Sequence, residues 1–273
     1  MKTTQSVTNS IMAALGLLST LLPISQTAHA QNDLAGDFVA PAVFQAAGPT
    51  AASIQSTVDA YRAALGDPNN ANNPGPLSSG RREINWDGGD PNIMDTTPPV
   101  TPFDVFLNTR GARFTTPGEG LSQAAPSGLP VLFNNPTYAT IFTTFSPSRL
   151  FTPVGSKVTD GSFFIPGTSG ASSATVSGFG VVFTDVDLPD GGKPHKASTL
   201  IEYFDRNGKR IFASFVPSSP GDASLSFIGI KFNDAPIASV RITTDAVPGK
   251  NDDRRHDIVI MDDFIYGEPQ PLQ

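Results

Sequence analysis

Short runs of β-forming residues recur roughly every ten residues between Arg81 and Gly267. Residues that favour turns, Gly, Pro, Asn and Asp, separate these runs. The chain contains 25 Gly and 25 Pro spread over its whole length, which leaves little room for long helices. This pattern predicts an all-β fold, either a sandwich or a barrel. The predicted strands are REINW, TPFDVFLN, ARFTT, YATIFTTF, RLFTPV, DGSFFIPG, ATVSGFGVVFTDVD, STLIEYFD, KRIFASFV, ASLSFIGIKF, ASVRITTD and IVIMDDFIYG.

The clearest turn signal lies in IEYFDRNGKRIFASF, between Ile201 and Phe215. Asn207 and Gly208 stand between two strand-like runs, and both residue types tolerate a positive φ angle. We therefore expect a tight β-hairpin at this position.

Residues 31–80 differ in composition from the strand-rich part, and one helix is predicted there. Gly66 is suited to end this helix, and the Asn/Pro/Gly-rich residues 67–80 are predicted to form a loop. We interpret 31–80 as an N-terminal extension of a β-domain over 81–267, because a lone amphipathic helix needs another surface to pack on. Residues 268–273 are predicted to be a C-terminal tail. The helix is predicted at about residues 50–65, where apolar residues lie on one face at Ile54, Val58, Tyr61 and Leu65.

The first thirty residues have the pattern of a secretory signal peptide. Lys2 gives a positive start, residues 11–24 form an apolar stretch, and Ala28-His29-Ala30 matches a cleavage site. Cleavage there would leave 243 residues, whereas the alternative is an uncleaved membrane anchor. The rest of the chain contains no apolar run of membrane-spanning length. We therefore expect a secreted protein, extracellular or periplasmic, with no membrane span in the mature chain.

The acidic charge of the chain restricts its partners. The net charge is −7, and it becomes −8 when Lys2 is removed with the signal peptide. Such a charge disfavours nucleic acid and anionic membranes as partners and favours cations. The chain has no Cys, so no disulfide holds this exported protein. Its core, with or without a bound metal, must supply the stability.

Known catalytic patterns are sparse in the sequence. It contains no G-x-S-x-G motif. The part after the signal peptide contains only His195 and His256, neither with a second His at metal-ligand spacing. We therefore predict neither a Ser-His-Asp hydrolase nor a zinc site, and we favour a non-catalytic protein.

Two adjacent aspartates, Asp262 and Asp263, interrupt the apolar strand predicted at Ile258–Gly267. Both faces of this strand are apolar, so we expect a central strand in which at least one carboxylate is partly buried. A buried carboxylate needs a partner. Three explanations stand side by side: a bound Ca²⁺, an ion pair with an arginine such as Arg241, and a β-bulge that turns both side chains toward water.

The strand with Asp262 and Asp263 resembles the last strand of calcium-stabilised jelly-roll modules, many of which bind carbohydrate. Within residues 177–267, the segments GFGVVFTDVD, LIEYFDRNGKRIF, FIGIKFNDAPIASVRI and MDDFIYG also resemble a jelly-roll module of exported bacterial surface proteins. This resemblance implies a β-sandwich of jelly-roll type in which Asp262 or Asp263 holds a structural Ca²⁺ near the first strand. The resemblance does not assign the first-strand ligand, for which Glu83 and Asp87 are candidates. Some of these surface proteins end in a Pro-Glu-Pro signal, a membrane helix and a basic tail. This chain ends in GEPQPLQ, so we expect it to be released or held non-covalently.

Other acidic and aromatic residues are weaker candidates. Asp185 and Asp187, at the end of a predicted strand, form either a second cation site or a solvated turn. The mixed charge run at 252–257 is predicted to be an exposed loop whose charges balance. Trp86 and Tyr138 are candidates for stacking on a sugar ring, with core packing as the competing interpretation.

Together these observations predict an exported, non-catalytic protein that binds glycan or cell-surface material and contains a structural Ca²⁺. Fold analogy carries the binding prediction, because no motif in the sequence specifies a ligand. Two alternatives stay open: a secreted hydrolase with an acidic site built from loops, and a structural matrix protein without a small ligand.

Overall fold

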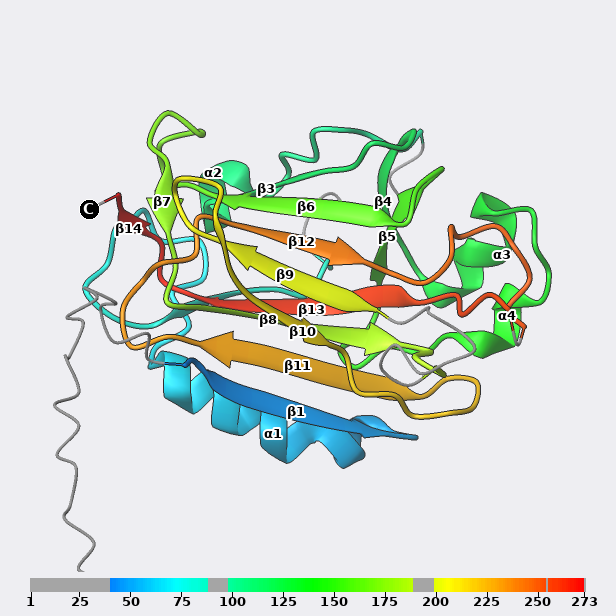
Figure 1. Ribbon diagram of the computed structural model, residues 1–273. Helices are drawn as coiled ribbons and strands as arrows, with labels where there is room; N and C mark the ends of the chain where they lie inside the picture. Colours follow the sequence, from blue (N-terminus) through cyan, green and yellow to red (C-terminus); the bar gives the residue numbers. More distant parts are fainter. Residues whose placement is uncertain (1–39, 88–97, 189–198, 254, 273) are drawn as a thin grey trace, which may run out of the picture. The chain divides into compact units, whose positions relative to one another are not determined.

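Two antiparallel β-sheets pack face to face and form a β-sandwich, which confirms the predicted all-β class (Figure 1). This computed structural model describes residues 40–87, 98–188, 199–253 and 255–272. The predicted signal peptide lies outside these residues. No helix in the described part of the chain is long and apolar enough to cross a membrane.

The larger sheet has seven strands: β1 (Ala42–Gly48), β2 (Arg81–Ile84), β4 (Gly120–Ala124), β5 (Leu150–Val154), β8 (Gly178–Thr184), β11 (Leu225–Lys231) and β13 (Ile260–Gly267). Their order is β1-β11-β8-β13-β5-β4, and β2 also pairs with β13. Strand β13 is central, because β8 lies along one side of it while β5 and β2 share the other side.

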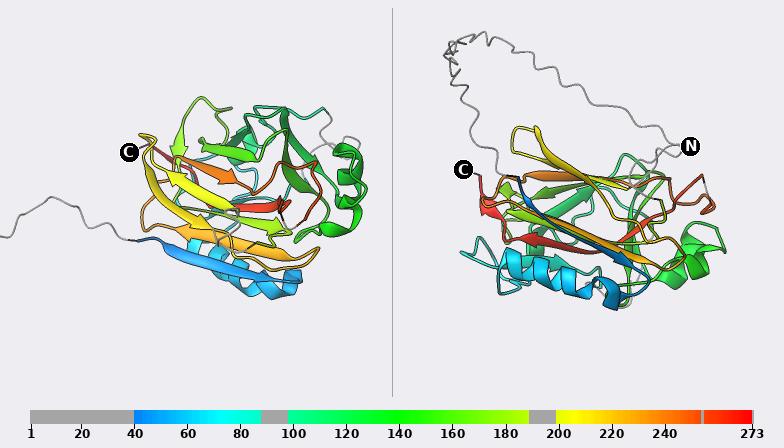
Figure 2. Two further views of the ribbon diagram at one scale, coloured as in Figure 1. Left: turned by 45° about the vertical axis from the view of Figure 1, so that its right-hand side comes forward. Right: turned by 60° about the horizontal axis from the view of Figure 1, so that its bottom comes forward.

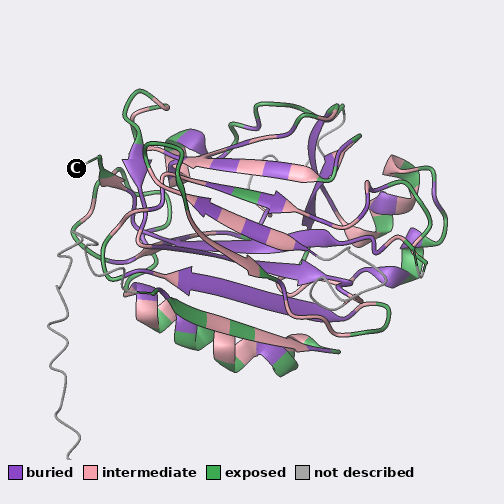
Figure 3. Cartoon of the chain, viewed as in Figure 1, coloured by how far each residue is buried: buried purple, intermediate pink, exposed green. Residues whose placement is uncertain are grey.

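The smaller sheet has five strands: β3 (Ala112–Thr115), β6 (Val158–Phe163), β9 (Leu200–Phe204), β10 (Arg210–Phe215) and β12 (Ser239–Thr243). Their order is β10-β9-β12-β6-β3. Burial alternates along β6, β9 and β12, so one face of this sheet packs on the core and the other faces solvent (Figure 3). A separate two-stranded sheet joins β7 (Ala174–Thr175) to β14 (Gln270–Pro271).

A Phe-rich core fills the space between the two sheets. It contains Phe179 and Phe183 of β8 and Phe264 of β13 from one side, and Phe114 and Phe163 from the smaller sheet. Strands β8, β11 and β13 are buried along nearly their whole length (Figure 3). They are covered on both faces, which explains why their sequences are continuously apolar rather than alternating.

Helix α1 (Ala51–Leu65) lies on the outer face of the larger sheet (Figure 2). Its predicted position and its buried face are confirmed. Tyr61 packs on glycines of the sheet, since a Cβ atom built at Gly180 or Gly229 would lie 2.8 Å from its ring. The Tyr61 hydroxyl also donates a hydrogen bond to the carbonyl of Ile230, at 3.1 Å. These glycines therefore let the helix approach the sheet closely.

The N-terminal extension contributes a strand as well as the helix. Strand β1 pairs with β11 along its whole length and forms one edge of the larger sheet. Its sequence, AVFQAAG, is Ala-rich and is not predicted to be a strand. Pairing with β11 and contact with α1 override this weak local preference.

Two predicted strands contain short helices instead. Helix α2 (Leu107–Arg110) takes up the end of TPFDVFLN, and α4 (Tyr138–Ile141) takes up the start of YATIFTTF. The 3₁₀ helix η1 (Pro126–Gly128) and α3 (Leu129–Leu132) precede α4. Residues of α3 and α4 share an apolar cluster with Ile260, the first residue of β13, and with Ile258 just before it. This packing decides their conformation against the β-forming preference of the local sequence.

The hairpin between β9 and β10 is confirmed, but its turn is longer than Asn-Gly alone predicts. Gly208 adopts a φ angle of 74°, whereas Asn207 has no positive φ. The Asp205 carboxylate accepts hydrogen bonds from the backbone N–H groups of Asn207 and Lys209, at 2.8 and 2.9 Å. Asp205 therefore shapes this turn together with Gly208.

The segment after β13 is not a free tail. Glu268 is buried and accepts two hydrogen bonds from Arg82 of β2, at 2.6 and 2.7 Å. It also accepts hydrogen bonds from Asn70 Nδ2 and the backbone N–H of Leu77, both in the loop before β2. This buried ion pair joins the loop, β2 and the C-terminal segment at one end of the sandwich.

Candidate functional site

A β-bulge accounts for Asp262 and Asp263 in the middle of β13. Opposite these two residues, β8 supplies only Val182. The extra residue changes which side chains face the core, because Met261 and Phe264 both lie between the sheets. In a regular strand, two residues at this spacing would lie on opposite faces. The regular alternation of faces along a strand is therefore broken at the bulge.

Both carboxylates of the bulge are buried, with 0% of Asp262 and 3% of Asp263 exposed. Asp262 Oδ2 accepts a hydrogen bond from the backbone N–H of Phe145 at 2.6 Å. Asp263 Oδ1 accepts one from the Ser146 hydroxyl at 2.5 Å. Asp263 Oδ2 lies 3.6 Å from a guanidinium nitrogen of Arg62 on α1. The two carboxylates therefore contact both the segment with Phe145 and Ser146 and helix α1, which lie on the outer face of the larger sheet.

The bulge and an arginine partner are both present, but not in the form predicted. The bulge does not turn the carboxylates to water, and the arginine is Arg62. Arg241 instead pairs with Asp160 on the solvent face of the smaller sheet, at 2.7 and 3.0 Å. Glu83 lies on the neighbouring β2 and binds Arg62 at 2.8 Å. Asp87 accepts hydrogen bonds from two backbone N–H groups just before β5.

Burial raises the pKa of Asp262 well above its usual range, and the adjacent Asp263 carboxylate raises it further. Burial also raises the pKa of Asp263, while the Ser146 hydroxyl and the Arg62 guanidinium act in the opposite direction. These effects favour the neutral form of Asp262 more strongly than that of Asp263.

A second group of carboxylates gathers at one end of the sandwich. We call it the Asp185 cluster, and it consists of Asp185, Asp187, Asp222, Asp252 and Asp257. They come from the loops after β8, before β11 and before β13. These loops meet because β8 is antiparallel to both β11 and β13. The carboxylate of Asp257 joins two of the loops, accepting hydrogen bonds from the backbone N–H groups of Asp187 and Leu188 at 3.3 and 3.1 Å.

Asp185 does not lie in a solvated turn. It is fully buried, and its φ angle of 68° lies in the left-handed region, which is unfavourable for a residue with a Cβ. Burial, followed by repulsion from the carboxylates of the cluster, raises the pKa of Asp185 to about 9. Burial likewise raises the pKa of Asp257 to about 7.

The predicted exposed loop at 252–257 is also different in the structure. Asp257 is buried, and Asp252 is half-buried with its carboxylate accepting a hydrogen bond from the backbone N–H of Ile258 at 2.9 Å. Asp252 and Asp257 of this run therefore turn inward, whereas Asp253 is exposed as predicted. Asp190, the next acidic residue after Asp187 in the sequence, lies outside the described residues.

Tyr138 is fully buried and holds the loop before β13 in place. Its hydroxyl donates a hydrogen bond to the carbonyl of Lys250 at 2.6 Å and accepts one from the backbone N–H of Gly249 at 2.8 Å. Burial raises the pKa of Tyr138, and the nearby Asp252 and Asp185 carboxylates add to the effect. Tyr138 therefore lies beside the Asp185 cluster and offers no ring face to a sugar.

Trp86 is a core residue in the structure. Its ring stacks on Phe151 with the ring centroids 3.8 Å apart, and its Nε1 donates a hydrogen bond to the carbonyl of Asp262 at 2.8 Å. It is fully buried, so neither ring face can contact a ligand. For Trp86 and Tyr138, core packing is the interpretation that the structure supports.

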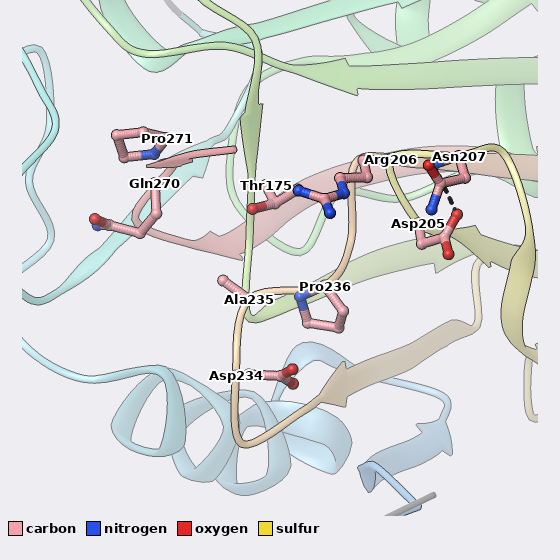
Figure 4. A pocket seen from close by; sticks show the side chains of 9 residues that line it. All are labelled: Thr175, Asp205, Arg206, Asn207, Asp234, Ala235, Pro236, Gln270 and Pro271. Atoms are coloured by element: carbon pink, nitrogen blue, oxygen red, sulfur yellow. Dashed lines mark hydrogen bonds between the residues drawn. The ribbon is translucent and has the colours of Figure 1, made fainter. Parts of the chain in front are cut away.

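An open pocket of about 330 Å³ lies beside the turn between β9 and β10 (Figure 4). We call it the hairpin pocket. The turn forms one wall, and the loop before β12 and the β7–β14 ribbon form the others. In Figure 4, Arg206 extends from the turn toward Thr175. The polar residues that line the hairpin pocket are Thr175, Asp205, Arg206, Asn207, Asp234 and Gln270.

A second hollow of about 300 Å³ borders the same turn on the solvent face of the smaller sheet. Phe204 contributes a half-buried aromatic ring, and Asp160 and Arg241 contribute a charged pair. The turn itself is evident in the sequence, whereas the two hollows are not. Their other walls come from segments far apart in the chain, which only the sheet order brings together.

Comparisons with known proteins leave the chain without an assigned family. No protein-family model matches it, and neither a curated protein nor a solved structure matches it. The proposed function therefore rests on the geometry of the chain's own residues.

Proposed function

We propose that this chain is an exported, non-catalytic β-sandwich of jelly-roll type that binds a glycan or similar polar cell-surface material beside its β9–β10 turn. The hairpin pocket is the observation that carries the proposal. Its volume of about 330 Å³ lies at the small end of the range for ligand sites. Six of its nine lining residues have polar side chains, which suits a ligand that carries hydrogen-bonding groups.

The walls of the hairpin pocket match the chemistry of sugar hydroxyls. Asp234 offers acceptors, Arg206 offers donors, and Asn207 offers both. Such planar groups bind two neighbouring oxygens at once, as adjacent hydroxyls of a sugar ring present them. The second hollow adds an aromatic ring, Phe204, close to the same turn. Together the two hollows suit an extended glycan.

The alternatives predicted from the sequence make different demands. A hydrolase needs an acid that reaches its substrate. The two carboxylic acids with the most strongly raised pKa in the Asp185 cluster, Asp185 and Asp257, are 0% and 1% exposed. From these positions they cannot contact a substrate. A matrix protein requires self-association, which sedimentation at working concentration measures.

A glycan array screened with the purified protein tests the proposal first, and any glycan that binds is then titrated against variants. Arg206→Ala and Asp234→Ala should each weaken binding by roughly 10- to 100-fold, the loss expected for a hydrogen bond to a charged group. Arg210→Ala is the matched control. It removes the same charge from the adjacent strand, where Arg210 pairs with Glu202 outside the pocket.

Two results would count against glycan binding at this place. If no glycan on the array binds, the proposal that the protein binds glycan is contradicted. If a glycan binds equally well to the wild type and to both pocket variants, its binding site is not the hairpin pocket.

A further inference from the structure

We propose that the Asp185 cluster is a Ca²⁺ site in which Asp185 and Asp252 supply the carboxylate ligands. The cation then lies at the end of the sandwich rather than at the bulge of β13. This inference is independent of glycan binding.

Asp185 is the observation that points to a ligand. Its side chain is 0% exposed, and neither carboxylate oxygen has a hydrogen-bond partner among the described residues. The buried hydroxyl of Ser224 is also unpartnered within that part of the chain, and the Ser224 carbonyl accepts the backbone N–H of Asp185. A carboxylate in such surroundings must either lose its charge or gain a cation.

The surrounding charges favour a cation strongly. The groups that act most on Asp185 are all carboxylates, with Asp252 first and Asp187, Asp257 and Asp222 after it. None of the ion pairs between described residues involves any member of the cluster. The carboxylates repel one another without a cation, and all of them attract a divalent ion placed among them.

The available ligands favour Ca²⁺ over other metals. Among the described residues, no three acidic or histidine side chains already converge as a complete metal site. An ion here therefore binds two carboxylates and takes its other ligands from backbone carbonyls and water. Ca²⁺ accepts six to eight oxygen ligands in flexible geometry, whereas Mg²⁺ demands a near-ideal octahedron and Zn²⁺ prefers nitrogen and sulfur.

The bulge of β13 is less suited to a cation. Three of its four carboxylate oxygens already have a partner, and one of these partners is the positive guanidinium of Arg62. A divalent ion would have to displace Arg62 or lie beside it at a cost in repulsion.

Thermal unfolding of the protein, first in EDTA and then with added Ca²⁺, tests this inference. Ca²⁺ at about 100 times its Kd should raise the unfolding midpoint by roughly 5–10 °C. Asp185→Asn should abolish the rise and leave the metal-free midpoint equal or higher at pH 8, because Asn has the same shape and no charge to bury. Asp252→Asn should also abolish the rise or reduce it strongly.

Tb³⁺ luminescence provides a second readout that does not depend on stability. The buried Tyr138 beside the cluster should sensitise Tb³⁺ emission in the wild type. The emission should disappear in Asp185→Asn. It should persist in Asp262→Asn, the matched control, which removes a buried carboxylate at the bulge.

Two outcomes would overturn the inference. One is a wild-type midpoint that does not change up to about 10 mM Ca²⁺, beyond the weakest range of extracellular calcium modules. The other is a rise that persists in Asp185→Asn and disappears in Asp262→Asn, which would place the ion at the bulge. If Asp185→Asn does not fold, Asp252→Asn decides the same question, since Asp252 lies half-buried in a loop.

Discussion

Asp262 shows how a carboxyl group is held inside a sheet without a matching positive charge. Its Oδ2 accepts the backbone N–H of Phe145, while its Oδ1 has no partner among the described residues. The charged groups that face the bulge are Asp263 on the same strand, Glu83 on β2 and Arg62 on α1. Two of these three are acidic, so the neutral form of Asp262 is favoured.

This environment predicts how stability depends on pH. The raised pKa means that folded Asp262 holds its proton at pH values where an unfolded Asp, with a pKa of about 4, has lost it. Between these two pKa values the free energy of unfolding therefore falls as the pH rises. Asp262→Asn should make this fall less steep, measured by urea unfolding in EDTA at pH 5, 7 and 9.

Asp253→Asn is the control for this experiment. Hydrogen bonding to the backbone N–H of Arg255 lowers the pKa of Asp253, so its contribution is lost only as the pH falls through the lowered pKa. Above pH 5 this variant should keep the wild-type slope. An equal slope for Asp262→Asn and the wild type would contradict the neutral state of Asp262.

At the scale of elements, α1 depends on one large side chain that packs on a glycine surface. Tyr61 is fully buried, and its ring centroid lies 5.4 Å from that of Phe44 on β1 and 5.5 Å from that of Phe227 on β11. Gly180 and Gly229 leave the space that its ring occupies. A side chain at either position would push the helix away from the sheet.

Gly229→Ala should lower the free energy of unfolding by about 1–3 kcal/mol, the usual cost of overpacking. Its new methyl group would lie 2.8 Å from the Tyr61 ring. Tyr61→Phe is the comparison, since it keeps the ring and loses only the hydrogen bond to Ile230, at a cost of about 1 kcal/mol. Combining Gly229→Ala with Tyr61→Leu should cost less than the sum of the single changes, because a smaller side chain relieves the clash. Additive costs in chemical denaturation would argue against this packing.

Across the whole molecule, burial is most complete in the centre of the larger sheet, and we expect the backbone amides there to be the best protected from hydrogen exchange. Strands β8 and β13 are buried at every residue, whereas β10 lies at the edge of the smaller sheet with Phe215 41% exposed. Opening of an edge strand exposes less apolar surface than opening of a central one, so it costs less free energy.

Hydrogen exchange followed by mass spectrometry should show this order. Peptides from β8 and β13 should exchange slowest among the described strands, and peptides from β10 should exchange faster by a large factor. Equal protection of β10 and β13 would mean that the two sheets open as one unit.

The sequence alone determined the features that depend on neighbours in the chain. The spacing of Ile54, Val58, Tyr61 and Leu65 predicts α1, and Asn207-Gly208 predicts the hairpin. The recurrent runs of β-forming residues predict the all-β class, because each run has its own local preference for the strand conformation. The tertiary structure decided what depends on distant partners: the pairing of β1, the short helices, the bulge of β13 and the burial of Trp86.

The Asp185 cluster shows most clearly which features follow from the sequence and which require the tertiary structure. The residue types in Asp185-Val186-Asp187 are evident in the sequence, and so is the acidic run before β13. Their meeting is not evident, because it requires β8 to pair with both β11 and β13 so that three loops converge at one end. Burial of a carboxyl group, and with it the need for a proton or a cation, arises only when those loops pack together, since the free energy of a charge depends on what surrounds it in space.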